Sequence, residues 1–226
     1  MADGVLIVGA SRGTGLEVTR LLAARREPVT AFVRPGTDMA GLLQLRVKLY
    51  KGAILDPRSV EGALASGDFR AVIDTVGGKR GEPRPDYHGT RNLVDAARKA
   101  GVPRFIFVTA IGCGDSRGAV GPKVLEFLGA VLDEKTLGEN YLMASGLDYT
   151  ILRPGGMTHD PASGTAIRTE DRMAMGVINR ADLARLVVEC LDDPLTAGKI
   201  YHAIDPAIQR QAPLQRGEDL PGGRVQ

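Results

Sequence analysis

Short apolar runs alternate with amphipathic stretches along most of the chain. Four runs in the first half are rich in β-branched residues and are predicted as buried strands, at residues 4–9, 27–33, 45–52 and 70–76. Apolar residues at helical spacing predict helices between or after these runs, at residues 14–26, 56–66, 85–101 and 121–146. Two further strands are expected at residues 104–112 and 147–156. This alternation predicts an α/β fold, a doubly wound parallel sheet with helices on both faces.

The pattern changes after Pro154. Residues 154–180 are rich in Gly, Thr and Met without a clear period, and a helix at 179–193 and a strand at 199–205 follow. Irregular loops at the carboxyl ends of parallel strands line ligand crevices, so we expect 154–180 to be a small substrate-side portion of the site. An ordinary surface loop is the alternative.

The chain is expected to form one domain over residues 1–206, because an α/β chain of 226 residues does not require a boundary. Residues 207–226 are polar and rich in Pro and Gly, and are expected to form a flexible tail. No exposed apolar segment is evident in the sequence, which slightly favours a monomer over a homodimer.

Composition excludes several classes of function. The hydrophobic share is 43% and the charged share 25%, as in ordinary globular proteins, and the formal net charge is only +2. Because the 29 basic residues are scattered, we expect no nucleic-acid partner, and no apolar run approaches the ~20 residues of a membrane span. Cys113 and Cys190 form no Cys-x-x-Cys motif and no signal peptide is evident, so a cytoplasmic protein is expected.

The segment "GASRGTG", residues 9–15, joins the first predicted strand to the first helix. Gly9 allows a tight turn, Gly13 lets backbone N–H groups approach a pyrophosphate, and Gly15 allows close packing of helix on strand. The positive end of the helix dipole faces the same point. The loop therefore predicts binding of a dinucleotide phosphate, and a glycine-rich turn without a ligand is the alternative.

Two arginines refine that prediction. A cation at a helix N-terminus opposes the helix dipole by ~0.3–1 kcal/mol unless an anion lies beside it, and Arg12 stands there. NAD-selective folds usually carry an acid at the end of the second strand, where this chain has Arg34. Arg12, Arg34 and Ser11 would complement a 2′-phosphate, which predicts NADPH over NADH as cofactor. Solvated surface arginines are the alternative.

Four segments occur in a specific order and spacing: "GASRGTG", "DYHGTRNLVDAARKAGVPRFIFVT", "EKTLGENYLMASGLDYTILRPGGM" and "INRADLARLVVECL". Through them, from Val5 to about Asp205, the chain resembles the atypical short-chain dehydrogenase/reductase family. The resemblance is greatest to its small NmrA-like and biliverdin-IXβ/flavin reductase-like members. It implies a Rossmann-type core, an NADP(H) or NAD(H) cofactor, and a site at the carboxyl ends of the strands.

The resemblance also implies roles for single residues. At the phosphate end, Ser11, Arg12 and Thr14 would contact the phosphates and Arg34 the 2′-phosphate. Where the family often has an adenine-contacting Asp, this chain has Ala53 and Ile54 after Gly52, so contact there would come from backbone or packing. Around the nicotinamide and its ribose the implied residues are Thr75, Val76 and Gly77 within 74–78, Thr109, Ala110, Lys135, Pro154, Gly155, Gly156 and Met157.

The chain departs from the family at the catalytic positions. The superfamily's Tyr stands four residues before the Lys, and this chain has Val131 there. The usual Ser near the end of the fifth strand is replaced by Thr109 and Ala110, and Tyr141, six residues after Lys135, lies on another helix face. Lys135 and Thr109 remain the catalytic candidates, and ordinary Tyr/Lys carbonyl reduction is not expected.

Hydride transfer from the cofactor does not require the missing Tyr and Ser. A flavin, quinone, enone or tetrapyrrole-like acceptor can take its proton from solvent, so the sequence predicts an NADPH-dependent oxidoreductase for a planar or conjugated small molecule. The alternative is a non-catalytic NADP(H)-binding redox sensor, regulator or assembly factor of the NmrA-like type.

Other polar residues have plainer interpretations. His88, His159 and His202 lack ligand spacing, so no metal site is expected. Lys135 could simply be a surface lysine paired with Glu139 one helical turn away. Asp182 fits a helix N-terminus, and Tyr87 is the one phenol expected near the cleft that could replace the missing acid.

Overall fold

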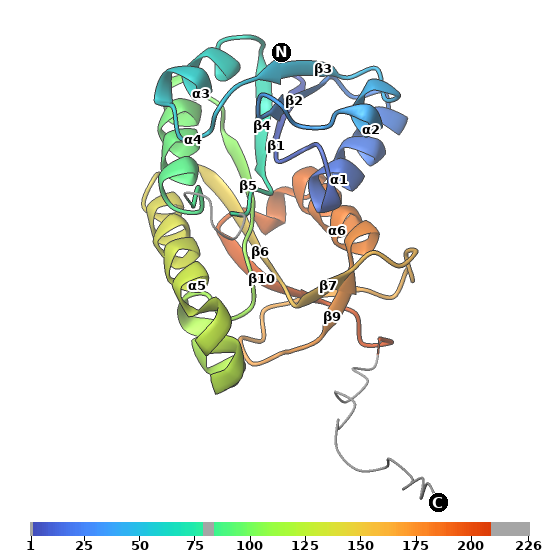
Figure 1. The fold of residues 1–226 in the computed structure, drawn as a ribbon, viewed down its shortest axis with the longest axis vertical. Coiled ribbons are helices and arrows are strands. Elements are labelled where there is room, and N and C mark those ends of the chain that lie inside the picture. Colours follow the sequence, from blue (N-terminus) through green and yellow to red (C-terminus); the bar gives the residue numbers. More distant parts are fainter. Residues whose placement is uncertain (1, 79–83, 209–226) are drawn as a thin grey trace, which may run out of the picture.

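The computed structural model describes residues 2–78 and 84–208. A twisted sheet runs through the molecule and helices cover both of its faces (Figure 1). The strands are β1 Gly4–Val8, β2 Val29–Val33, β3 Lys48–Lys51, β4 Phe69–Asp74, β5 Arg104–Val108, β6 Asp148–Pro154, β7 Gly156–Thr158, β8 Ile167–Thr169, β9 Val177–Asn179 and β10 Lys199–Ile204. The helices are α1 Gly13–Ala24, α2 Ala40–Leu43, α3 Pro57–Leu64, α4 His88–Lys99, α5 Pro122–Met143 and α6 Arg180–Asp192, with short 3₁₀ turns η1 Gly114–Ala119 and η2 Pro194–Thr196.

The main sheet has the order β3-β2-β1-β4-β5-β6-β10-β8. Its direction of growth reverses between β1 and β4, which confirms the doubly wound architecture and places a crevice at the carboxyl ends of these strands. One prediction needs correction. The sheet is not wholly parallel, because β8 pairs antiparallel with β10 at its edge.

Alternating side chains of the strands fill two cores. Val5 and Ile7 of β1 face the layer of α1 and α6, which contributes Val18 and Val187 to the same buried cluster. Leu6 of β1 points to the opposite face, against the layer of α3, α4 and α5 (Figure 1). Because both faces are covered, β1 is buried along its whole length, as its uninterrupted apolar sequence predicts.

The segment 154–180 is more regular than expected. Strands β7 and β9 pair in parallel to form a small second sheet, with Met157 opposite Ile178, and β8 joins the main sheet. These short strands have no sequence period because each contributes only three residues. The predicted tail, 207–226, lies outside the described residues from 209 onward. Within the described part of the chain, no helix has the length and apolar character needed to cross a membrane.

Candidate functional site

A cleft of about 1050 Å³ opens at the carboxyl ends of the central strands. Most of the predicted site residues line it: Gly9, Ser11, Arg12, Gly13, Thr14, Arg34, Ala53, Ile54, Thr75, Val76, Gly77, Thr109, Lys135 and Met157. Five predicted residues do not line it: Gly15, Ala110, Pro154, Gly155 and Gly156. The structure thus brings together residues from both halves of the sheet around one cavity.

The glycine loop has the geometry that its sequence predicts. Gly9 and Gly13 have φ angles of +83° and +56°, which favour glycine. A Cβ on Gly15 would lie 2.4 Å from the carbonyl oxygen of Gly9, so α1 packs directly on the turn. Arg12 makes no side-chain cap hydrogen bond to the first turn of α1. The N–H groups at that N-terminus therefore suit the diphosphate of a dinucleotide.

Lys135 occupies the inner end of the cleft and is not a surface residue. It is 7% exposed, and its Nζ lies 3.0 Å from Oδ1 of Asp86 and donates to the carbonyl oxygen of Val76 at 3.2 Å. The interpretation of a surface lysine paired with Glu139 is therefore wrong. The contact with Asp86 is an ion pair without hydrogen-bond geometry, since Oδ1 of Asp86 has no hydrogen-bond partner among the described residues, so the ammonium group has N–H groups left for a ligand in the cleft.

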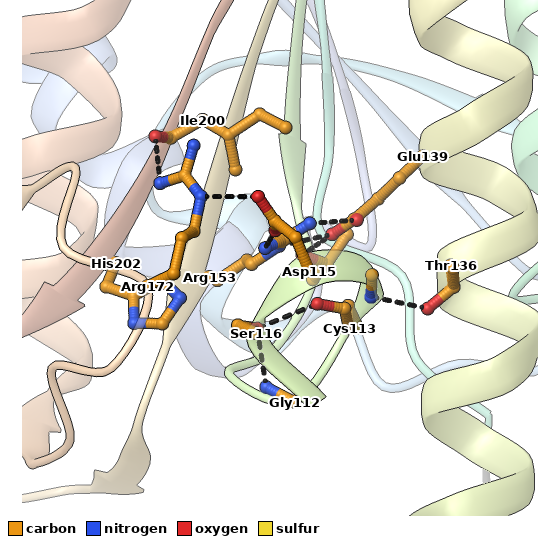
Figure 2. Close-up of polar contacts among 12 residues, drawn as sticks. Gly112, Cys113, Asp115, Ser116, Thr136, Glu139, Arg153, Arg172, Ile200 and His202 are labelled. Carbon is orange, nitrogen blue, oxygen red and sulfur yellow. Dashed lines mark hydrogen bonds and ion pairs between the residues drawn. The ribbon is translucent and has the colours of Figure 1, made fainter. Parts of the chain in front are cut away.

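Glu139 is fully buried and belongs to a different network. Its carboxylate accepts from Oγ1 of Thr109 at 2.6 Å and from Nε and Nη2 of Arg153 at 3.1 and 2.7 Å. Figure 2 shows this ion pair continuing from Arg153 to Asp115 and on to Arg172. Because the Thr109 hydroxyl proton is directed to Glu139, its oxygen can only accept a hydrogen bond from the cleft.

Asp74 fixes the turn below the cleft. It is fully buried, and its two carboxylate oxygens accept from the N–H of Val76 and from Oγ1 of Thr90, each at 2.9 Å. Burial raises the pKa of Asp74 from 3.8 to about 6, against the lowering effect of these hydrogen bonds and of Lys135. Asp74, whose pKa is about 6, thereby positions the backbone of Val76, and the carbonyl oxygen of Val76 accepts from Lys135.

Among the described residues that line the cleft there is no tyrosine. Tyr141 donates its hydroxyl to Asp95 at 2.6 Å, which also raises the pKa of the phenol. Tyr87 packs against His88 and Tyr141, with ring centroids 5.0 and 6.5 Å apart. The part of the chain that the structure describes therefore offers no phenol at the position of the missing acid.

The cleft is also lined by residues that were not predicted, and two of them have nitrogen-bearing side chains. Arg180, the first residue of α6, and His159 both line the cleft. Met157, expected over the carboxamide, lies beside the glycine loop, with its Sδ 3.8 Å from Oγ1 of Thr14 and 3.3 Å from Nη1 of Arg180. The signal that drew attention to Arg12, a basic residue at a helix start, also marks Arg180.

Asp182 lies in the first turn of α6, where its carboxylate was expected. The structure adds a second role, because this carboxylate accepts from the N–H groups of Ser163 and Gly164, at 2.7 and 3.0 Å. Asp182 therefore anchors the segment between β7 and β8 to α6.

Both cysteines of the sequence lie in the described part of the chain and are buried. Burial raises the pKa of the Cys113 thiol to about 11, and it also raises the pKa of Cys190. Cys113 lies beside the ion-pair network, next to the turn that Ser116 closes (Figure 2).

Residues 9–194 match a family model described as NAD(P)H-binding. The solved structure of ChuY, an anaerobillin reductase from Escherichia coli O157:H7, is 33% identical, with a TM-score of 0.83 over 91% of this chain and 98% of ChuY. The NAD(P)H azoreductase of Xenophilus azovorans is 27% identical, over 97% of this chain and 74% of that protein. The photosystem II assembly factor Ycf39 of Synechocystis is 27% identical, over 88% of this chain and 62% of its own length.

Proposed function

Because this chain belongs to the NAD(P)H-binding family, we propose that it is an NADPH-dependent reductase of planar or conjugated small molecules. The general assignment, an NAD(P)H-dependent oxidoreductase, follows from the family match and from relatives named as reductases. The preference for NADPH and the class of acceptor are the proposed parts.

The observation that supports the proposal is that the polar side chains at the inner end of the cleft already have partners within the protein. The Thr109 hydroxyl donates to Glu139, and Lys135 is held by Asp86 and Val76. Neither is placed as the proton relay that carbonyl reduction to an alcohol requires. Flavins, quinones, enones and tetrapyrroles delocalise the charge that arrives with hydride, and they take the proton from solvent.

A bound NADPH would supply the hydride. The chain's own contribution is to hold the cofactor: the glycine loop with Arg12 at the diphosphate, Arg34 at the 2′-phosphate, and Lys135 at the nicotinamide ribose. The oxygen of Thr109 can accept a hydrogen bond from the carboxamide and orient the ring.

The absorbance of the reduced nicotinamide, followed with a panel of acceptors, tests this function. We expect oxidation of NADPH by at least one flavin, quinone, enone or tetrapyrrole, and none by simple ketones or aldehydes. Turnover of simple carbonyls would contradict the proposal, since the described residues that line the cleft include no tyrosine to act as the proton donor of ordinary carbonyl reduction.

A non-catalytic role as a redox sensor or assembly factor is the second candidate. The similarity to Ycf39 favours it, as does the replacement of the usual Tyr by Val131. Tight binding of NADPH with no oxidation by any acceptor of the panel would support this candidate over the first.

A further inference from the structure

Arg180 faces the phosphate end of the cleft from α6, opposite the loop that carries Arg12. We propose that Arg180 and Arg12 together clamp the diphosphate of the bound dinucleotide, with Arg180 lying over Gly13. This inference rests on the binding of NAD(P)H and does not depend on the proposed hydride transfer.

The geometry places Arg180 at the diphosphate. Helices α1 and α6 pack side by side on one face of the sheet (Figure 1). A Cβ built on Gly13 would lie 3.3 Å from Nη1 of Arg180 and 3.7 Å from its Cζ, so the guanidinium lies against the loop glycine itself. Since the backbone at Gly13 is where the diphosphate binds in this loop, Arg180 is within reach of that group.

The environment of the Arg180 guanidinium also favours a bound anion. Its Nη1 contacts the thioether of Met157, a weak acceptor, and its Nε is buried without a partner among the described residues. Burial lowers the pKa of Arg180, and the neighbouring charge of Arg12 lowers it further. Each arginine stands at a helix N-terminus, where a cation opposes the dipole. An anion between the two arginines would offset their mutual repulsion and their unfavourable position at the helix N-termini.

Two cofactors distinguish the role of Arg180 from that of Arg34. NADPH and NADH share the diphosphate, whereas only NADPH has the 2′-phosphate. Loss of a diphosphate contact must therefore weaken both cofactors by the same factor, and loss of a 2′-phosphate contact must weaken only NADPH.

Calorimetric titration of the full chain with NADPH, NADH and adenosine 2′-monophosphate tests the clamp. Arg180→Met keeps an unbranched apolar stem and removes the charge. We expect the affinity for NADPH and for NADH to fall by the same factor, about tenfold or more, because a charge-assisted hydrogen bond is lost. Binding of the 2′-monophosphate should not change. Arg180→Lys should recover part of the loss, and Arg20→Met, on the exposed side of α1, should bind like the wild type.

Thermal unfolding of the protein without cofactor gives a second readout. Removing one of two repelling cations should leave the unfolding temperature of Arg180→Met unchanged or higher, while the stabilisation by saturating NADPH becomes smaller. Unchanged affinity for NADPH would overturn the proposal, as would a loss confined to NADPH or a lower unfolding temperature without cofactor. A wild type that binds NADPH but reduces no acceptor would contradict only the proposed function.

Discussion

The two ends of the cleft differ in what their charged groups already contact. At the phosphate end, Arg12 and Arg180 lie close together without a carboxylate partner among the described residues. At the inner end, Lys135 is paired with Asp86, and Glu139 with Arg153. The positive charges at the first end are suited to an anionic ligand, whereas the charged groups at the second end are neutralised by ion pairs within the protein. In the proposed function, the first end binds the phosphates of the cofactor and the second end positions its nicotinamide.

The largest expected effect comes from breaking the inner network. Within the described residues, Glu139→Ala leaves buried Arg153 with only the exposed Asp115 as a charged partner, so we expect a loss of ~3–5 kcal/mol in the free energy of unfolding. Urea denaturation measures it. The double variant Glu139→Leu with Arg153→Met should recover much of the stability, and a single variant as stable as the wild type would refute the role of the pair.

A pH effect at Asp74 is expected to be somewhat smaller. Its pKa is raised from 3.8 to about 6 in the folded protein, so the folded state binds this proton more tightly than the unfolded state. The contribution of this carboxyl group to the free energy of unfolding is fully present below about pH 4. It declines by roughly 3 kcal/mol as the pH rises from about 4 to about 6. Asp74→Asn should remove that decline. Unfolding free energies of both proteins at pH 4 and pH 7 check it, and a difference that does not vary with pH would contradict the assignment.

The phosphate end should control cofactor choice. Arg34→Asp replaces a cation by an acid at the end of β2, and we expect the ratio of affinities for NADPH and NADH to fall by about 100-fold. Titrations with both cofactors measure the ratio. Arg58→Asp, the same charge change on α3 outside the cleft, is the matched control. Unchanged selectivity would show that Arg34 does not meet the 2′-phosphate.

The smallest effect is expected at Thr109. Because its hydroxyl proton goes to Glu139, Thr109 offers the cofactor at most one accepted hydrogen bond, so Thr109→Val should lower the rate of NADPH oxidation by less than about tenfold and stability by about 1 kcal/mol. Steady-state kinetics and urea denaturation on the same preparation test both parts. A loss of activity of about 100-fold would instead make Thr109 a proton donor.

Local sequence was enough to predict the backbone geometry of the glycine loop and the alternation of strands and helices. The glycines at 9, 13 and 15 determine the backbone of the loop in which they stand, so their spacing in the sequence is enough to predict its geometry. The partners of Lys135 and Glu139 come from distant strands and loops, and helical spacing alone suggested the wrong pair. Arg180 reaches Gly13 only because α6 packs against α1, which no local pattern encodes.

Buried thiols matter in a protein whose proposed acceptors are electrophiles. Quinones and enones alkylate thiolates by conjugate addition. With the pKa of Cys113 raised to about 11 and both thiols buried, neither Cys113 nor Cys190 presents a reactive thiolate to such molecules. A reductase built this way would resist inactivation by the acceptors that it turns over.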